Sequence, residues 1–374
     1  MTHPYNSQPE RAFWRRAIGE RMPEEIGDWY TRRFPLDGKK IATAGSCFAQ
    51  HVGRHLRANG FDVIDTEPPP PGLPVEDHGN WGYGLYSARY GNVYTSRQLV
   101  QLLDRALGDF TPVEDWWEKD GGVVDAFRPT IEPEPFGSVA EMRALRADHL
   151  AATAEALRKA DVLVFTLGLT EAWLSSQDGA CFPLCPGTAG GSFDPARHTL
   201  HNLGSAAVRA DMEEFLARIR ALNPGLEILL TVSPVSLMAT ATPQQVAVAT
   251  VYSKSVLRAV AGELAEAHPF IDYFPSYDII TGPASRGVFY KPGMRDVSPE
   301  GVAHVMRQFF AEHRPPEPTV LPLAQPAARS TTAMASRPAP RPAPTPAPAP
   351  AGADDEDIRC DEELLNTFGR KPGG

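Results

Sequence analysis

The chain has 374 residues, of which 42% are hydrophobic, and its formal net charge at pH 7 is −10. That much apolar sequence buries at least one sizeable core, so one or two domains are expected. The negative net charge argues against nucleic acid and other polyphosphate partners. The basic residues near the N-terminus, which come only in pairs, do not form a patch that would bind them. No window resembles a membrane span and the first residues lack an apolar signal region, which predicts a cytoplasmic protein.

Composition divides the chain into four parts. Residues 1–38 mix charges with aromatic anchors, which predicts a lead-in that packs on the outside of a core. Residues 39–313 alternate short apolar runs with helical patterns and are expected to form one α/β domain. Residues 314–352 are rich in proline and alanine, a composition typical of a disordered or extended linker. Residues 353–374 form an acidic C-terminal peptide.

The C-terminal peptide allows two interpretations. Its apolar residues are Ile358, Leu364, Leu365 and Phe368, which lie on one face if the peptide forms a short helix. Such a face would dock on another protein, whereas a disordered solubilising tail would need no partner. Both interpretations remain open from the sequence.

The order of the predicted elements indicates a parallel sheet covered by helices on both faces. The predicted strands are 41–44, 61–64, 162–167, 228–232 and 271–274. The predicted helices are 48–59, 97–107, 139–159, 211–222, 243–268 and one that begins at Pro299, after Ser298 as its N-cap. This order predicts a three-layer α/β/α sandwich with a five-stranded, mostly parallel, flavodoxin-like sheet.

Gly45 and Ser46 directly follow the first predicted strand. Ligand sites in open parallel sheets form at the carboxyl ends of the strands, so this pair lies where function is usually found. Glycine permits the sharp turn, and the amides that open the next helix can stabilise a negatively charged oxygen. The arrangement provides half of an acyl-transfer site, although the same pair could also form a simple turn with an N-cap.

Four sequence blocks resemble the GSCFA domain family, which is similar to the SGNH (GDSL-type) hydrolases. The blocks are AGSCFA at 44–49, RYGNVY at 89–94, TLGLTEAW at 166–173 and TVSPV at 231–235. Together with the last helix they cover roughly residues 40 to 310. SGNH enzymes deacylate or transacylate lipids and sugars on a fold of the predicted type, so the resemblance implies a serine esterase or O-acyltransferase that acts on a carbohydrate ester, with acetyl as the expected acyl group.

The resemblance also implies roles for individual residues. Ser46 takes the place of the nucleophile, and its amide would join Gly91 in the oxyanion hole. Thr170 stands where SGNH enzymes place an asparagine donor.

Three residues in or beside these blocks are assigned to the substrate: Asn92, Glu171 and Trp173. A carboxylate beside an indole would bind a sugar hydroxyl and stack on its ring.

The last block departs from the SGNH pattern, because the usual Asp-x-x-His pair is missing before the final helix. Asp296 falls near the place of the histidine. Serine is a weak nucleophile without a base, so the base must come from elsewhere. The candidates are His198, His201 and His304, any of which Asp296 could orient, or Asp296 itself.

No cofactor or metal is expected. Cys181, Cys185, His198 and His201 approach the spacing of a zinc site, but the gap between the histidines is one residue short and an irregular loop is the preferred interpretation. Cys47 is expected to be a buried structural thiol. The alternative function is a non-catalytic carbohydrate-binding or scaffold protein on a degenerate hydrolase fold, whose C-terminal peptide recruits a protein partner.

Overall fold

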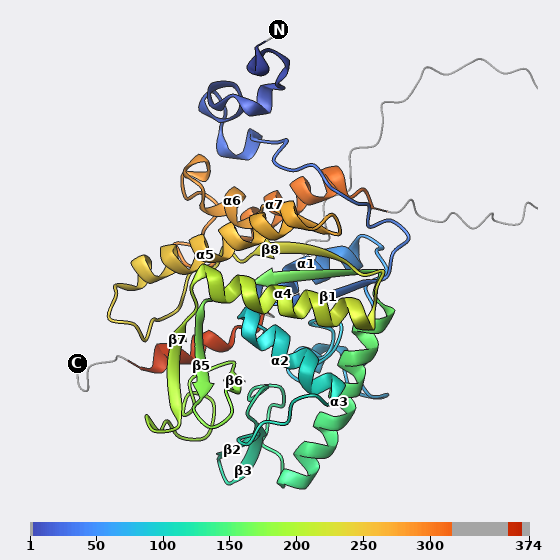
Figure 1. The fold of residues 1–374 in the computed structure, drawn as a ribbon, viewed down its shortest axis with the longest axis vertical. Coiled ribbons are helices and arrows are strands. Elements are labelled where there is room, and N and C mark those ends of the chain that lie inside the picture. Colours follow the sequence, from blue (N-terminus) through green and yellow to red (C-terminus); the bar gives the residue numbers. More distant parts are fainter. Residues whose placement is uncertain (1–2, 316–357, 369–374) are drawn as a thin grey trace, which may run out of the picture.

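The computed structural model describes residues 3–315 and 358–368 (Figure 1). Its centre is a four-stranded parallel sheet in the order β1-β4-β8-β9. The strands are β1 Ile41–Gly45, β4 Val162–Leu167, β8 Glu227–Val232 and β9 Ile271–Phe274. Continuous apolar runs form them because both faces of the sheet are covered. The predicted α/β architecture with a parallel sheet flanked by helices is confirmed.

The predicted fifth strand is reduced to one contact. Val63 forms a single parallel bridge with Ile41, and the sheet therefore has four named strands rather than five. The chain then leaves the sheet: the Thr66 amide donates not to β1 but to the Ser87 carbonyl oxygen, at 3.0 Å. The prolines at 68–71 follow, and proline has no amide proton to extend a ladder.

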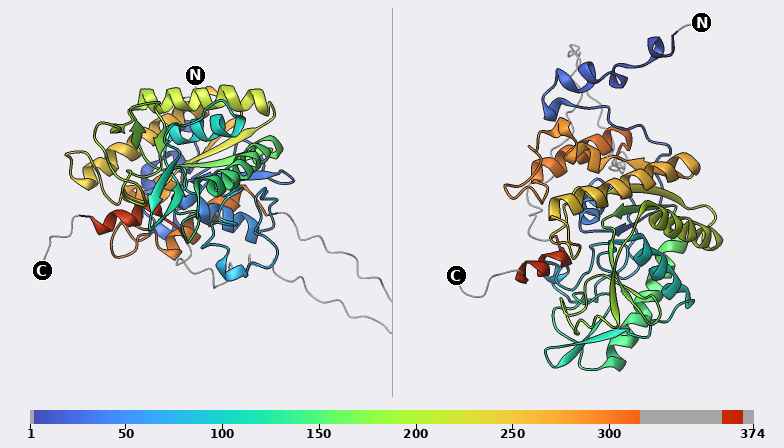
Figure 2. Two further views of the ribbon diagram at one scale, coloured as in Figure 1. Left: turned by 90° about the horizontal axis from the view of Figure 1, so that it is seen from below. Right: turned by 60° about the vertical axis from the view of Figure 1, so that its left-hand side comes forward.

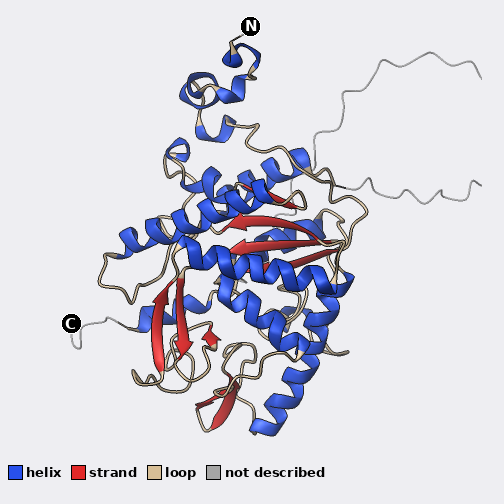
Figure 3. Cartoon of the chain, in the orientation of Figure 1, coloured by secondary structure: helices blue, strands red, loops and turns tan. Residues whose placement is uncertain are grey.

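Helices cover both faces of the sheet (Figure 3). Side chains alternate along each strand, so Val162 and Val164 face one core while Leu163 and Phe165 face the other. The first core lies against α1 Phe48–Ala58, α6 Ser276–Thr281 and α7 Pro299–Glu312. The second lies against α2 Ser96–Leu107, α3 Val139–Lys159, α4 Ser205–Leu222 and α5 Val246–Ala267.

Two small antiparallel sheets lie outside the central one. The hairpin joins β2 Trp116–Lys119 to β3 Gly122–Asp125. The other sheet has the order β6-β5-β7, with β5 Glu171–Ser175, β6 Cys181–Phe182 and β7 His198–Asn202. Because β5 begins four residues after the end of β4, this second sheet borders the carboxyl edge of the central sheet.

The N-terminal residues reach the core through aromatic and apolar side chains. Tyr30 and Phe34 are buried in the core that contains α7, and the Tyr30 hydroxyl donates to Asp272 Oδ2 at 2.5 Å. Single helical turns precede and interrupt the main elements, at Pro4–Ser7, Glu10–Ala12, Arg15–Gly19, Pro23–Glu25, Val75–Asp77 and Pro283–Ser285. Among the described helices, none is long and apolar enough to cross a membrane.

The C-terminal segment returns to the body of the protein. Residues 358–368 include a short helical stretch, η8 Asp361–Thr367, which lies far from the start of the chain (Figures 1 and 2). The segment thus reaches the side of the molecule toward which the strands of the central sheet point (Figure 3).

Candidate active site

Gly45 produces the turn that places Ser46 at the carboxyl edge of the sheet. Its φ angle is +135°, and a Cβ atom there would lie 2.5 Å from the Thr166 carbonyl oxygen, so only glycine fits. The next amide, that of Ser46, donates to the same carbonyl oxygen at 3.1 Å. The chain then enters α1 two residues later.

The Ser46 hydroxyl is buried and has no partner. The residue is 2% exposed, and its Oγ forms no hydrogen bond with any described residue. Gly168 makes room beside it, because a Cβ atom on Gly168 would lie 2.9 Å from Ser46 Cβ. A buried hydroxyl without a partner costs about 1–3 kcal/mol, so each one needs an explanation. Among the described residues, the hydroxyls of Thr43 and Thr166 share this state with Ser46.

Lys254 on α5 brings a buried amine to the same place. It is 1% exposed, and its Nζ donates to the Gly168 carbonyl oxygen at 2.6 Å. Ser46 and Lys254 therefore both border Gly168. Burial lowers the pKa of Lys254 to about 8, although Glu362 and then Cys47 act in the opposite direction. At pH 7 about a tenth of an amine with this pKa is neutral, and this fraction of Lys254 can accept a proton.

Lys254 was not among the residues predicted from the sequence. A signal for it exists, since Leu257, Ala261 and Leu264 follow it at spacings of three, seven and ten residues. These spacings place Lys254 on the apolar, buried face of its helix. A lysine on such a face is costly unless it has a specific role.

The predicted oxyanion groups have different surroundings. The Ser46 amide already donates to Thr166. The Thr170 hydroxyl donates to Asn202 Oδ1 at 2.7 Å, and its amide donates to Ser253 Oγ. The Gly91 amide donates no hydrogen bond within the described ranges, and Gly91 lines the same pocket as Asn92. Gly91 is therefore the predicted donor that remains available.

The three candidate histidines lie elsewhere. His198 Nε2 is 3.0 Å from Glu114 Oε2 in the small sheet, and His201 is exposed on the same strand. His304 stacks on Phe289 with ring centroids 4.6 Å apart, and burial lowers its pKa to about 4. In residues 3–315 and 358–368, no hydrogen bond joins any of the three to Ser46.

The loop before α7 presents Arg295 and Asp296 near the site. The two side chains form an ion pair of 2.5 Å, and both line a pocket with Cys47, the residue after Ser46. The carboxylate of Asp296 is about half exposed, with 47% of its side-chain surface accessible. The position near which SGNH enzymes carry histidine therefore holds an arginine-paired carboxylate.

Among the predicted substrate residues, Asn92 lies at the site. The Tyr86 hydroxyl is 2.6 Å from Asn92 Oδ1 and 3.2 Å from the Ser46 carbonyl oxygen, which links the two residues. Glu171 accepts a hydrogen bond from the Ala241 amide at 3.1 Å. Trp173 packs edge-on against Phe193, in the segment between β6 and β7, and is partly buried against the cluster that contains Phe182.

The cysteine and histidine of the zinc-like spacing have other partners. Cys181 Sγ lies 3.7 Å from Thr95 Oγ1, and His198 pairs with Glu114. Within the described residues, no group of three or more His, Cys, Asp or Glu side chains is placed to hold a metal ion. Cys47 is buried, 5% exposed, directly beside Ser46.

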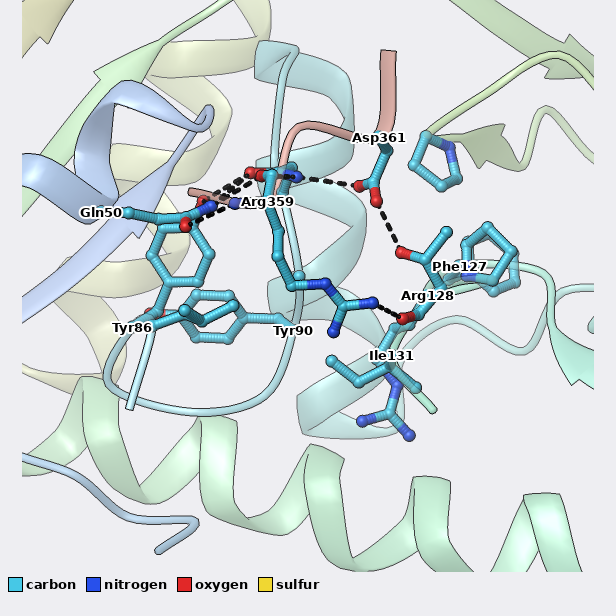
Figure 4. Close-up of a pocket in the computed structure, with 14 residues that line it drawn as sticks. Gln50, Tyr86, Tyr90, Phe127, Arg128, Ile131, Arg359 and Asp361 are labelled. Atoms are coloured by element: carbon cyan, nitrogen blue, oxygen red, sulfur yellow. Dashed lines mark hydrogen bonds between the residues drawn. The ribbon is translucent and has the colours of Figure 1, made fainter. Parts of the chain in front are cut away.

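The C-terminal segment covers this site, which no sequence pattern foretold. Asn92 Nδ2 donates to Asp361 Oδ2 at 2.9 Å (Figure 4). The Tyr94 hydroxyl accepts from the Asp361 amide at 3.1 Å. Tyr94 in turn accepts at its carbonyl oxygen from the Gly168 amide, beside Ser46. Residues more than 260 positions apart in the sequence thus meet around one serine.

Comparisons with solved structures give distant similarities only. A carbohydrate esterase family 2 enzyme with a carbohydrate-binding domain from Corynascus thermopiles (Myceliophthora fergusii) matches with 14% identity and a TM-score of 0.23, over 65% of this chain and 57% of that one. An acetyl xylan esterase from the rumen bacterium Butyrivibrio proteoclasticus matches with the same identity and TM-score, over 65% of this chain and 56% of the other. The chain therefore spans less than two thirds of the length of either protein.

Curated proteins include no match to this sequence. A family model, in contrast, matches most of the chain. It covers residues 40–309, which include β1, Ser46 and nearly all of α7. The chain belongs to the GSCFA family.

Proposed function

We propose that the protein is a serine-dependent esterase or O-acyltransferase that forms an acyl intermediate on Ser46. The observation that carries the proposal is the buried, unpartnered Ser46 hydroxyl at the carboxyl edge of the sheet, next to Gly168, whose carbonyl oxygen accepts from a buried lysine amine. A nucleophile requires a base to remove its proton, and Lys254 is the basic group that borders the same glycine.

The reaction has two steps. In the first, Ser46 Oγ attacks the acyl carbonyl carbon while its proton passes to the neutral amine of Lys254, and the resulting ammonium gives that proton to the ester oxygen of the leaving alcohol as its bond to the acyl carbon breaks. In the second, the neutral amine takes a proton from the attacking water or acceptor hydroxyl, whose oxygen bonds to the acyl carbon, and returns a proton to Ser46 Oγ as the acyl–serine bond breaks. The Gly91 amide and the first turn of α1 would stabilise the negative oxygen of each tetrahedral intermediate.

The proposal replaces the Ser-His-Asp arrangement of SGNH hydrolases with a serine and a lysine on the same type of fold. His198 then pairs with Glu114, His304 bonds Arg307, and Asp296 pairs with Arg295, while His201 is exposed on β7. A lysine acts as a base when its surroundings lower its pKa, as burial does for Lys254.

The substrate class follows from the family resemblance. We propose a carbohydrate or polysaccharide that carries an acyl ester, with acetyl as the expected acyl group, handled in the cytoplasm without a cofactor. Asn92 is the predicted substrate residue that lies at the Ser46 site, through Tyr86. The choice between hydrolysis and transfer depends on whether water or an acceptor hydroxyl reaches the acyl-serine.

Turnover of a small acetyl ester tests the proposal. Ser46→Ala removes the hydroxyl and is expected to abolish turnover, whereas Ser285→Ala is the matched control, because Ser285 is an equally buried serine whose hydroxyl bonds Gly282 O in another part of the fold. Loss of activity in Ser46→Ala alone supports the proposal. Equal rates for wild type and Ser46→Ala would reject Ser46 as the nucleophile for that ester.

A second candidate function is a non-catalytic carbohydrate-binding or scaffold protein. It is favoured by the absence of any described histidine contact with Ser46 and by the segment that covers the site. Binding of an acetylated oligosaccharide with the same affinity by wild type and Ser46→Ala, without turnover by either, would favour this function.

A further inference from the structure

The acceptor surface for the C-terminal segment begins at Gln50 on α1. Gln50 Nε2 donates to the Arg359 carbonyl oxygen at 2.8 Å, and the Arg359 amide donates back to Gln50 Oε1 at 3.1 Å. Asn92 Nδ2 donates to the same Arg359 carbonyl at 3.1 Å. Gln50 and Asn92 are 0% and 5% exposed, so two buried amide side chains satisfy the backbone of the segment (Figure 4).

The Arg359 side chain fills the pocket beside this backbone contact. Its guanidinium donates to the carbonyl oxygens of Asn80 at 3.0 Å, Gly79 at 3.2 Å and Thr130. Figure 4 shows the side chain extending between the tyrosines of the pocket and the 127–131 segment. Because the donors of a guanidinium group lie in one fixed plane, these three carbonyl oxygens fix the orientation of the Arg359 side chain.

Two carboxylates follow in the segment. Asp361 accepts from Asn92 Nδ2 at 2.9 Å and from Thr130 Oγ1 at 2.5 Å. Glu362 is 6% exposed, and its Oε2 lies 3.7 Å from an Arg295 guanidinium nitrogen. The Met238 amide donates to its other oxygen at 3.4 Å. The acceptor surface therefore offers a hydrogen-bonding or charged partner to each of Arg359, Asp361 and Glu362.

Cys360 completes the contact over the residue next to Ser46. Its Sγ lies 3.6 Å from an Arg295 nitrogen, and it lines one pocket together with Cys47 and Arg295. The neighbouring Cys47 thiol is the main cause that lowers the pKa of Cys360, although burial acts in the opposite direction.

Polar rather than apolar groups hold the segment. Phe368, which the sequence analysis placed on an apolar docking face, is 59% exposed, and Leu364 and Leu365 are only half-buried. A contact made mainly of hydrogen bonds releases more readily than an apolar core, because water replaces each bond. A tethered ligand also has an effective concentration on the order of 1 mM, so weak contacts suffice to fill the site.

We propose that residues 358–362 are an internal occupant of the Ser46 site, which closes the site until the segment leaves. The proposal rests on the proposed function where it concerns substrate, but the docking of the segment does not depend on catalysis. The surface formed by Gln50, Asn92, Thr130 and Arg295 is its acceptor. Substrate reaches Ser46 only when this surface is vacated.

Access to Cys47 tests the proposal without requiring activity. The double variant Arg359→Ala/Asp361→Ala in the full-length chain removes the side-chain bonds of both residues, and Thr367→Ala, on an exposed residue that bonds within its own turn, is the control. The variant loses five side-chain hydrogen bonds, three donated by Arg359 and two accepted by Asp361. Their loss is expected to raise the rate of Cys47 alkylation by iodoacetamide about 100-fold or more. Peptide mass spectrometry measures that rate, with buried Cys181 as the internal reference for unfolding.

The results separate the two proposals. Faster alkylation of Cys47 but not Cys181 in the double variant supports docking, and an unchanged Cys47 rate overturns it. Faster acetyl ester turnover in the double variant than in wild type supports closure, whereas equal turnover by two active proteins overturns closure and leaves the esterase proposal standing. If neither wild type nor the double variant turns over the ester, the esterase proposal fails for that substrate. The rate of Cys47 alkylation still shows whether the segment docks.

Discussion

Replacing Lys254 by methionine separates a catalytic base from a structural lysine. Methionine keeps the length and apolar stem of the side chain but loses the amine that bonds the Gly168 carbonyl oxygen at 2.6 Å. Lys159→Met is the matched control, because Lys159 is an exposed lysine paired with Glu155 on α3. Both variants lose one positive charge from a helix.

The structure sets the expected size of the two effects. Burial lowers the pKa of Lys254 from 10.5 to about 8, and a gap of this size means that the charged amine costs the fold about 3 kcal/mol at neutral pH. Methionine removes that cost but also a charge-assisted hydrogen bond of about 1.5–3 kcal/mol, so the free energy of unfolding should change by less than about 2 kcal/mol. Loss of a general base lowers turnover about 100- to 10,000-fold.

The assay is kcat/KM for an acetyl ester together with urea unfolding of each variant. A stable Lys254→Met protein with turnover near that of wild type would refute the assignment of Lys254 as the base. A loss of turnover that simply follows a loss of folded protein would also refute it, and Lys159→Met should match wild type in both measurements.

Three other predictions concern the same site and its support. The kcat/KM of wild type should rise about tenfold per pH unit up to about pH 8 and then level off, because the neutral amine of Lys254 is the active form. A pH-independent rate between pH 6 and pH 8 would argue against this. Folding lowers the pKa of Lys254, so its contribution to stability is present above its ordinary pKa of 10.5 and is lost as the pH falls through 8. Gly45→Ala should lower the free energy of unfolding by about 3 kcal/mol or more, or prevent folding. Gly108→Ala should lower it by only about 1 kcal/mol, because Gly108 also has a positive φ but no atom within 4 Å of an added Cβ. Thermal unfolding compares the two variants, and equal losses of stability would refute the steric argument. Asp125→Asn should cost about 3–5 kcal/mol, since it leaves the buried guanidinium groups of Arg128 and Arg146 without their shared carboxylate, while exposed Glu118→Gln should cost almost nothing in urea unfolding.

Much of the fold was predictable because its signals are local. The four central strands are short apolar runs, and the long helices carry repeating apolar positions, so most were expected within three residues of their observed bounds. The exception is α4, which begins at Ser205, six residues before the predicted start. The small sheet of β5, β6 and β7 escaped prediction, because β6 has two residues and β7 alternates polar types. Tertiary pairing with β5 rather than local preference makes these segments strands.

The site was predictable only in part. The position of Ser46 follows from the glycine after an apolar strand, which is a local pattern. Lys254 is one polar residue in a long helix, and its role emerges only when α5 packs beside Gly168. The contacts of the C-terminal segment join Gln50 to Arg359, 309 positions apart, through side-chain amides that have no sequence periodicity.

Identification of the acylated residue tests the central claim most directly. Brief incubation with an activated acetyl ester, acid quench and peptide mass spectrometry should place one acetyl group on Ser46, and the label should persist in Cys47→Ala but disappear in Ser46→Ala. Acetyl on Cys47 instead of Ser46, or an unlabelled Ser46 in a protein that turns over the ester, would contradict the account.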